Sequence, residues 1–252
     1  MASSLYIGPP PPSITIGTPA GYRAVVQNDG AVAYWRLNET SGTTAYDGIG
    51  GNNGTIIGGV TLNQPGPLSA SGSKAMLFNG SGWINVPNGA YKAIGTRPVS
   101  LEGWFQSTSP IKWCIDQKLN GNSGIPGVSI YGADTSNLYL HIFNGSSSPF
   151  SALYIPAPSA YIDGNWHHVV CVVERGTTEV GKIYVDGTLV GSANIPFTGT
   201  NFTNTYPFSI GMSNGVATTG IIGQLSEVAI YPIALTPTQV ANHYAARLRT
   251  TN

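Results

Sequence analysis

Residues 166–192 read WHHVVCVVERGTTEVGKIYVDGTLVGS and carry the clearest strand signals of the chain. It predicts three successive β-strands, because runs rich in β-branched residues are separated by short polar segments. The last two strands meet at Asp186-Gly187, a dipeptide that suits the two positive-φ positions of a type I′ turn. The stretch therefore predicts antiparallel sheet closed by a tight hairpin.

The two adjacent histidines in this stretch, His167 and His168, do not form a metal site. Neighbouring side chains of a strand point to opposite faces of the sheet, so the two rings cannot bind one ion together. The valines that follow occupy both faces, which predicts a strand buried on both sides. We interpret both residues as core histidines with structural hydrogen bonds. His141 and His243 stand alone in the sequence.

Further strands are expected at regular intervals, with Asn-Gly turns between several of them, as in a β-sandwich. A length of 252 residues suits one sandwich with a single core. The expected strands cover residues 31–37, 75–78, 83–86, 99–106, 112–117, 127–131, 138–143, 207–212 and 221–231.

One helix is expected, in TPTQVANHYAARLR near the C-terminus. Thr236 and Gln239 have the spacing of a capping box, and Pro237 fills the first helical position, where its missing N–H costs nothing. Val240, Tyr244 and Leu248 recur at helical spacing. We expect this apolar stripe to lie on the sandwich.

The charge content is low and balanced. Only 9% of the residues are charged, with 11 basic and 11 acidic. Nucleic-acid-binding proteins show a basic patch and anionic membranes attract polybasic segments, so neither partner is expected. No apolar run approaches the roughly 18 residues of a membrane span. The 41% hydrophobic content is enough to fill a sizeable core.

The first 21 residues form a Pro-rich arm, set apart from a domain that covers residues 22–252. Pro9, Pro10, Pro11 and Pro12 are consecutive and favour a polyproline II segment, and Ile14 and Ile16 follow in alternation. Two interpretations are open: a floppy leader, or a semi-rigid arm that docks on a neighbouring subunit. The arm lacks the basic and apolar regions of a secretory signal, and the start at Met1 favours a chain that is not exported.

Cys114 and Cys171 are too few for a disulfide framework and lack metal-ligand spacing. Both stand in apolar runs and are expected to be buried thiols. A single bridge between them is the alternative, and it requires their two strands to be adjacent or to face each other across the core.

Five segments together resemble the laminin G-like jelly roll of the concanavalin A-like lectin and glucanase superfamily. They are residues 31–55, AVAYWRLNETSGTTAYDGIGGNNGT; 75–87, AMLFNGSGWINVP; 99–106, VSLEGWFQ; 163–192, which includes DGNWHHVVCVVERG and KIYVDGTLVGS; and 223–244, GQLSEVAIYPIALTPTQVANHY. The resemblance implies an all-β, two-sheet antiparallel sandwich with one short C-terminal helix. It also implies binding rather than catalysis, as in most members.

The resemblance raises the question of structural calcium, which many relatives bind through loop oxygens. Asp47, in the long glycine-rich loop, matches the usual ligand, but Ser226 stands where the family commonly has an aspartate. Calcium takes six to eight oxygen ligands, several of them carboxylates. The alternative is that Asp47 caps the loop through local hydrogen bonds. No cofactor is required for either interpretation.

An enzyme is not expected, although the superfamily contains glucanases. Glycoside hydrolysis needs two carboxyl groups about 5 to 10 Å apart, and Glu102, Glu174, Glu179 and Glu227 each lack an acidic partner at strand spacing. For sugar binding, aromatic rings are the useful side chains. Trp83, Trp113 and Tyr206 are the candidates by type, with Tyr131 and Tyr161 behind them.

Two functions follow as hypotheses. The first is a non-enzymatic virion surface protein, a capsid decoration or fibre-type protein of a bacteriophage. It would be made in the host cytoplasm, bind capsid or tail proteins and itself through the arm, and contact host glycans. The alternative is a glycan-binding lectin or adhesin module at a bacterial cell surface.

Overall fold

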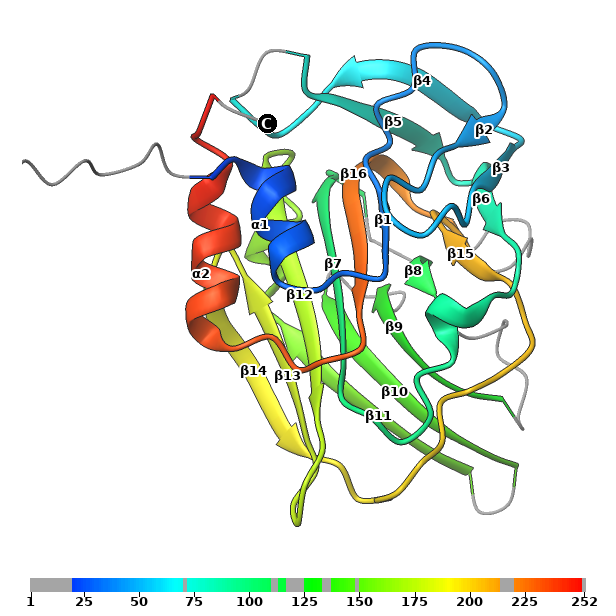
Figure 1. Cartoon of the computed structure of the whole chain (residues 1–252), viewed down its shortest axis with the longest axis vertical. Coiled ribbons are helices and arrows are strands. Elements are labelled where there is room, and N and C mark those ends of the chain that lie inside the picture. The colour runs from blue at the N-terminus through cyan, green and yellow to red at the C-terminus, as the bar shows by residue number, and fades with distance from the viewer. Residues whose placement is uncertain are drawn as a thin grey trace, which may run out of the picture.

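Two eight-stranded sheets, packed face to face, make up the protein (Figure 1). The computed structural model describes residues 20–69, 72–109, 113–116, 125–132, 137–147, 150–213 and 220–250. Every strand pair within these ranges is antiparallel. The expected all-β jelly-roll sandwich is confirmed.

The first sheet has the order β14-β13-β12-β7-β16-β5-β4, with β1 paired to β16. Its strands are β1 (Ala33–Trp35), β4 (Val60–Pro65), β5 (Lys74–Asn79), β7 (Val99–Gln106), β12 (Trp166–Glu174), β13 (Val180–Val185), β14 (Thr188–Asn194) and β16 (Ile222–Tyr231). The opening stretch of sequence thus supplies three consecutive strands of this sheet, as expected.

The second sheet has the order β11-β10-β9-β8-β15-β6-β3-β2. Its strands are β2 (Thr44–Ala45), β3 (Gly54–Ile57), β6 (Trp83–Val86), β8 (Trp113–Asp116), β9 (Pro126–Gly132), β10 (Leu138–Ser147), β11 (Phe150–Ala157) and β15 (Phe208–Ile210). Short 3-10 helices lie at Ala90–Lys92 and Ser159–Tyr161.

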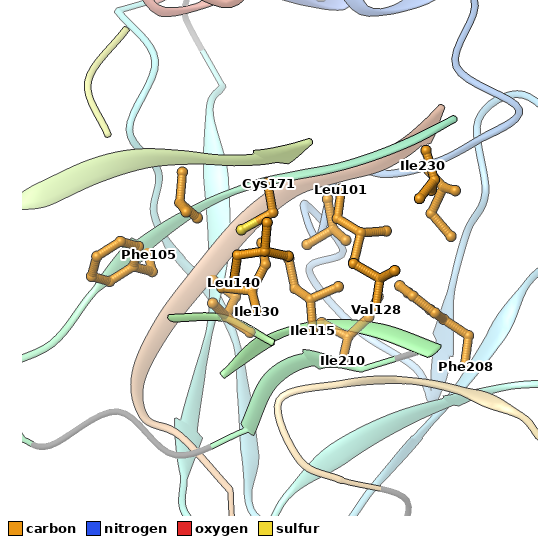
Figure 2. Packing of buried hydrophobic residues seen from close by; sticks show 14 of the residues in the cluster. Leu101, Phe105, Ile115, Val128, Ile130, Leu140, Cys171, Phe208, Ile210 and Ile230 are labelled. Carbon is orange, nitrogen blue, oxygen red and sulfur yellow. The ribbon is translucent and has the colours of Figure 1, made fainter. Parts of the chain in front are cut away.

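The core lies between the two sheets and follows from strand alternation. In β12, Val169, Cys171 and Val173 face the second sheet and are fully buried. Each such side chain contributes roughly 1.5 to 3 kcal/mol by leaving water. Figure 2 shows the packing of Leu101, Phe105, Cys171 and Ile230 of the first sheet with Ile115, Val128, Ile130, Leu140 and Ile210 of the second. Cys171 is therefore buried as expected, while the side chain of Cys114 lies outside the described part.

The hairpin between β13 and β14 has the predicted two-residue turn. Val185 pairs with Thr188, and Asp186 and Gly187 have φ values of 51° and 79°. The Asp186 carboxylate also accepts the backbone N–H of His168 at 2.9 Å. The turn thus sets the register of the hairpin and is also bonded to β12.

Two helices, not one, cover the outer face of the first sheet (Figure 1). The second, α2 (Pro237–Ala246), has the predicted capping box. It ends before Leu248, which is 64% exposed, so the expectation that Leu248 extends the apolar stripe is wrong. The first, α1 (Tyr22–Asn28), was not expected from the sequence.

Three further departures concern strands. The glycine-rich stretch that we expected to be one long loop contains β2 and the start of β3, and neither β4 nor β11 was predicted. The predicted strand over residues 31–37 is shorter, because β1 covers only Ala33–Trp35. Residues 1–19 of the predicted arm, which covers residues 1–21, lie outside the described residues. Neither helix of the described chain is long and apolar enough to cross a membrane.

Candidate functional site on the outer face of the second sheet

A continuous row of residues crosses all eight strands of the second sheet on its outer face. Register pairs them directly, strand by strand, as Tyr154, His141, Ser129, Asp116, Ser209, Asn85, Thr55 and Thr44. Directly paired residues of antiparallel strands project from the same face. With strands about 4.8 Å apart, seven intervals make this polar row about 34 Å long.

An aromatic row runs beside the polar row, two residues away on β9 and β10 and three residues away on β8, where the register shifts between Trp113 and Ile115. Tyr139 pairs with Pro156 on one side and with Tyr131 on the other, and Tyr131 pairs in turn with Trp113. Trp83 lies on the same side of the polar row as Tyr131. Tyr131 follows Ser129 by two residues on β9, and Trp83 precedes Asn85 by two residues on β6, which runs antiparallel to β9. We call the polar and aromatic rows together the binding platform.

The rings at one end of the platform pack against one another. His141 and Tyr154 are stacked, with centroids 4.4 Å apart and ring planes at 12°. Tyr131 lies 5.7 Å from the His141 ring and 6.0 Å from the Tyr154 ring. Tyr154 is 45% exposed, whereas His141 is buried beneath it. Partial burial raises the pKa of Tyr154, so its hydroxyl remains protonated at neutral pH.

Exposure varies along the polar row. Ser129 and Ser209 in the middle are buried, while Asn85 and Thr44 are half-buried and Thr55 is exposed. The Oδ1 atom of Asn85 is buried and accepts no hydrogen bond within the described residues. The platform therefore combines accessible rings with hydroxyl and amide groups, and its described rows contain neither lysine nor arginine.

Two of the three predicted ligand residues fall on the platform. Trp83 is half-buried at the start of β6, and the backbone of Trp113 pairs with Tyr131, although its side chain lies outside the described part. Tyr206 lies elsewhere: its carbonyl accepts a hydrogen bond from Lys92 Nζ, and Asn204 beside it donates to Pro126, at the far end of β9 from Tyr131. Sequence reasoning missed the register that joins Tyr139, His141 and Tyr154 to this site.

The predicted partner-binding residues of the arm cannot be placed. Pro9, Pro10, Pro11, Pro12, Ile14 and Ile16 all lie outside the described residues.

Asp47 organises its loop through hydrogen bonds. Its two carboxylate oxygens accept five N–H donors at 2.8 to 3.1 Å, from Tyr34, Ile49, Gly50 and twice from Asn52. Burial raises the pKa of this carboxyl, but the N–H donors outweigh burial and hold the pKa below its ordinary value.

This donor set does not fit calcium, because carboxylate lone pairs that accept N–H hydrogen bonds are not free to coordinate a metal ion. Ser226, which stands in place of the family aspartate, donates to the carbonyl of Lys74 at 2.9 Å. Nowhere in the described chain do three or more His, Cys, Asp or Glu side chains form a group that could hold a metal ion. Structural calcium at Asp47 stays an untested prediction that the geometry does not favour.

A second polar cluster is buried under the helices and is inaccessible to ligands. Glu102 accepts hydrogen bonds from His168 Nε2 at 2.7 Å and from Tyr22 at 2.6 Å, and it contacts His243 Nδ1 at 3.0 Å. His243 and His141, which stand alone in the sequence, both gain partners in the fold: His243 contacts Glu102, and His141 stacks on Tyr154 of the neighbouring strand. His167 and His168 do point to opposite faces and are buried, as predicted.

The four glutamates considered as catalytic acids are each bonded within the first sheet or its loops. Glu102 contacts His168 and His243, Glu174 contacts Lys182, Glu179 contacts Arg175, and Glu227 contacts Arg36. None of them belongs to the platform.

These features define a jelly-roll sandwich with one face covered by helices and the other carrying aromatic and polar rows. The chain belongs to the concanavalin A-like lectin/glucanases superfamily, whose family model matches residues 78–241. No curated protein sequence matches the chain.

Solved structures share the fold at low sequence identity. Domain 4 of AbnA, a GH43 extracellular arabinanase from Geobacillus stearothermophilus, in complex with arabinotriose, is 21% identical with a TM-score of 0.62, and the match covers 85% of this chain and 98% of that domain. The botulinum neurotoxin type G receptor binding domain is 17% identical with a TM-score of 0.56, over 86% of this chain and 51% of that one. A sialidase from Trypanosoma rangeli, in complex with 2,3-difluorosialic acid, is 17% identical with a TM-score of 0.61, over 88% of this chain and 34% of the enzyme.

The chain thus spans about half the length of the neurotoxin domain and about a third of the sialidase. Nothing in these comparisons indicates a virion protein, so the first functional hypothesis gains no support from them.

Proposed function

We propose that the protein is a non-catalytic glycan-binding module that holds a neutral saccharide chain along the binding platform. The observation that carries the proposal is the pair of adjacent rows, one aromatic and one polar, whose accessible members are the exposed Tyr154 and Thr55 and the half-buried Asn85 and Thr44. Aromatic rings pack on the apolar face of a sugar ring, while polar side chains fix its hydroxyls. The module would work at a bacterial cell surface, which was the alternative in the sequence analysis.

The dimensions of the platform favour an extended ligand. From Trp83 on β6 to Tyr131 on β9 there are three strand intervals, or about 14 Å. This spacing separates two aromatic positions by more than one sugar unit. A neutral chain is favoured over an acidic one, because the described rows offer no cationic side chain to pair with a carboxylate.

The absence of catalysis is part of the proposal. Glycoside hydrolysis uses two carboxyl groups that flank the scissile bond. The two rows contain a single acidic position, Asp116, and the buried glutamates of the first sheet lie on the opposite side of the core. Domain 4 of the arabinanase, which shares the fold, is in complex with arabinotriose, so this neutral oligosaccharide is the first ligand to test.

The test is affinity for arabinotriose and for a panel of neutral polysaccharides, measured by calorimetry and by affinity gel electrophoresis. We expect Tyr131→Ala and Tyr154→Ala each to weaken binding of the best ligand about two- to thirteen-fold, because one ring contact contributes roughly 0.5 to 1.5 kcal/mol. The loss should come without a change in unfolding free energy larger than about 1 kcal/mol for the exposed Tyr154.

Tyr206→Ala is the matched control. It removes the same ring at a similarly exposed position, 36% exposed, outside both rows. Equal losses in all three variants, or no binding to any neutral glycan of the panel, would contradict the proposal.

A further inference from the structure

The two helices leave a strip of the outer face of the first sheet accessible. Trp104 of β7 stacks on Tyr244 of α2 with centroids 5.9 Å apart, so the helices cover its row. The next row along the strands is the strip, and it faces away from the binding platform. Register pairs its members across β4, β5, β16, β7 and β12 as Thr61, Leu77, Gln224, Gln106 and Trp166.

Two aliphatic side chains are exposed beside each other on this strip. Leu77 is 37% exposed, and Ile222, two residues before Gln224 on the same face of β16, is 53% exposed. Both line a hollow of about 270 Å³ that no charged side chain lines. A single exposed leucine is ordinary in a folded protein, but covering two adjoining aliphatic side chains removes contiguous apolar surface from water. The strip therefore favours an apolar, uncharged occupant.

The N-terminal arm leaves the folded domain close to this strip. Helix α1 begins at Tyr22, whose ring centroid lies 6.1 Å from that of Trp104, in the row next to the strip. Ala20, the first described residue, accepts a hydrogen bond from Arg249 through its carbonyl. Figure 1 shows the start of α1 and the start of β16, the strand of Ile222, at the same end of the molecule. The chain that precedes Ala20 is thus tethered near the strip.

The composition of the arm matches the chemistry of the strip. Residues 1–21 contain no charged side chain, and their apolar members include the four consecutive prolines and two isoleucines of residues 9–16. Proline-rich segments dock in grooves with aromatic walls, because the polyproline II backbone is already extended and loses little entropy. The strip offers one such ring, the half-buried Trp166 on β12.

The length of the arm suffices to reach the strip. Pro12 stands eight residues before Ala20, a distance of about 25 Å at 3.1 Å per residue. From β4 to β12 the strip crosses four strand intervals, or about 19 Å. Because the arm is anchored beside the neighbouring row, residues 9–16 can lie along the strip without detaching Tyr22 from Trp104.

We propose that residues 9–16 of the arm lie along this strip of the same chain and cover Leu77 and Ile222. Docking within one chain is favoured over docking on a second copy, because the tether gives the arm a high effective concentration beside the strip. The arm then completes the outer layer of the first sheet next to α1 and α2. This role goes beyond glycan binding, since no residue of the binding platform takes part in it.

Solution NMR of the full chain tests this placement. In the unmodified protein, the backbone amides of residues 13–16 should have order parameters of about 0.85, the value for rigid backbone. The methyl groups of Ile222 should show NOEs to protons of the arm. Ile222→Ser should release the arm and lower these order parameters below about 0.6. Replacing Ile14→Ser together with Ile16→Ser should have the same effect from the side of the arm.

Ile233→Ser is the matched control, because Ile233 is 39% exposed and lies outside the strip, so the arm should keep its order parameters. An equal mixture of isotope-labelled and unlabelled chains separates contacts within one chain from contacts between two copies. Order parameters below about 0.6 in the unmodified arm overturn the proposal. Unchanged values in Ile222→Ser, or NOEs that arise only between two copies, also overturn it. The measurement involves no glycan, so its outcome is independent of the proposed function.

Discussion

Replacing Glu102 by alanine is expected to lower the free energy of unfolding by about 3 to 5 kcal/mol, the range for breaking a buried charged network by removing one partner. The carboxylate is fully buried between the first sheet and the helices. It is the shared acceptor of groups from four elements: Tyr22 of α1, His168 of β12, Tyr231 of β16 and His243 of α2. Its loss leaves all four without their acceptor.

The network explains how two short helices are fixed on a sheet. Helices of this length are marginal on their own, so their stability comes from packing. Tyr22 and His243 project from different helices onto one carboxylate, and His243 Nε2 also contacts Asp29 Oδ2, just after α1, at 2.8 Å. Glu102 therefore links both helices to the strand at the centre of the sheet.

Urea unfolding of the Glu102→Ala protein, monitored by fluorescence and far-UV circular dichroism, measures the effect. The control is Glu174→Ala, which breaks a part-exposed pair with Lys182 and should cost at most about 1 kcal/mol. If the two variants lose the same small amount, the buried cluster does not secure the helices.

The same network predicts that stability falls at alkaline pH. Burial lowers the pKa of His243, but the charge and hydrogen bonds of Glu102 and Asp29 outweigh burial and raise the pKa to about 9. Because the pKa in the folded state exceeds that in the unfolded state, near 6.5, this stabilisation is fully present below pH 6.5 and is lost as the pH rises to about 9. It amounts to on the order of 3 kcal/mol.

Unfolding free energies measured from pH 6 to pH 10 test this dependence. Glu102 has its pKa held well below the ordinary value by the two histidines, against the opposing effect of burial, so its own contribution is lost only in acid. In Glu102→Ala the alkaline fall should shrink, since the main charge that raises the pKa of His243 is gone. If the free energy of unfolding of the unmodified protein does not change between pH 6 and pH 10, the assignment of His243 as protonated is wrong.

The sequence predicted these parts of the sandwich well because their signals lie within a few consecutive residues. Asp186-Gly187 specifies its turn through backbone preference alone, and the capping box of α2 needs only Thr236 and Gln239. Helix α1 was missed because it has seven residues and no side-chain cap, and its Tyr22 and Val26 give only one helical repeat. Packing against the sheet, which no local pattern reports, stabilises it.

The candidate site could be predicted only in part, because it depends on register between distant strands. Residue type identified Trp83 and Trp113 as candidates for contact with sugar, but the same criterion also selected Tyr206, which lies outside the platform. Tyr154 belongs to β11, a strand that was not predicted, and it meets His141 only through the pairing of β10 with β11. Composition indicated a low charge content, and the described rows of the platform hold one acidic position, Asp116, and neither lysine nor arginine.

Asp47→Ala should lower the free energy of unfolding by about 3 kcal/mol. The carboxylate accepts five N–H donors, four of them from the backbone. A hydrogen bond to a charged group contributes about 1.5 to 3 kcal/mol net of its exchange with water, and we expect a total near the upper value because water replaces the lost acceptor at the N–H groups of this loop. One of these donors is the N–H of Tyr34 in β1, so the residue links the loop to the first sheet. Because its pKa is lowered in the folded state, this stabilisation is present at neutral pH and is lost as the pH falls through that lowered value.

Thermal unfolding at pH 7 measures the loss, and Glu39→Ala is the matched control within the same region. Glu39 accepts one backbone N–H, from Tyr46 at 2.7 Å, so its removal should cost only about 1 kcal/mol. Adding millimolar calcium should leave the melting temperature of the unmodified protein unchanged, because both Asp47 oxygens already accept N–H bonds. A calcium-dependent rise in melting temperature that Asp47→Ala abolishes would show instead that the loop rearranges to present this carboxylate to the metal.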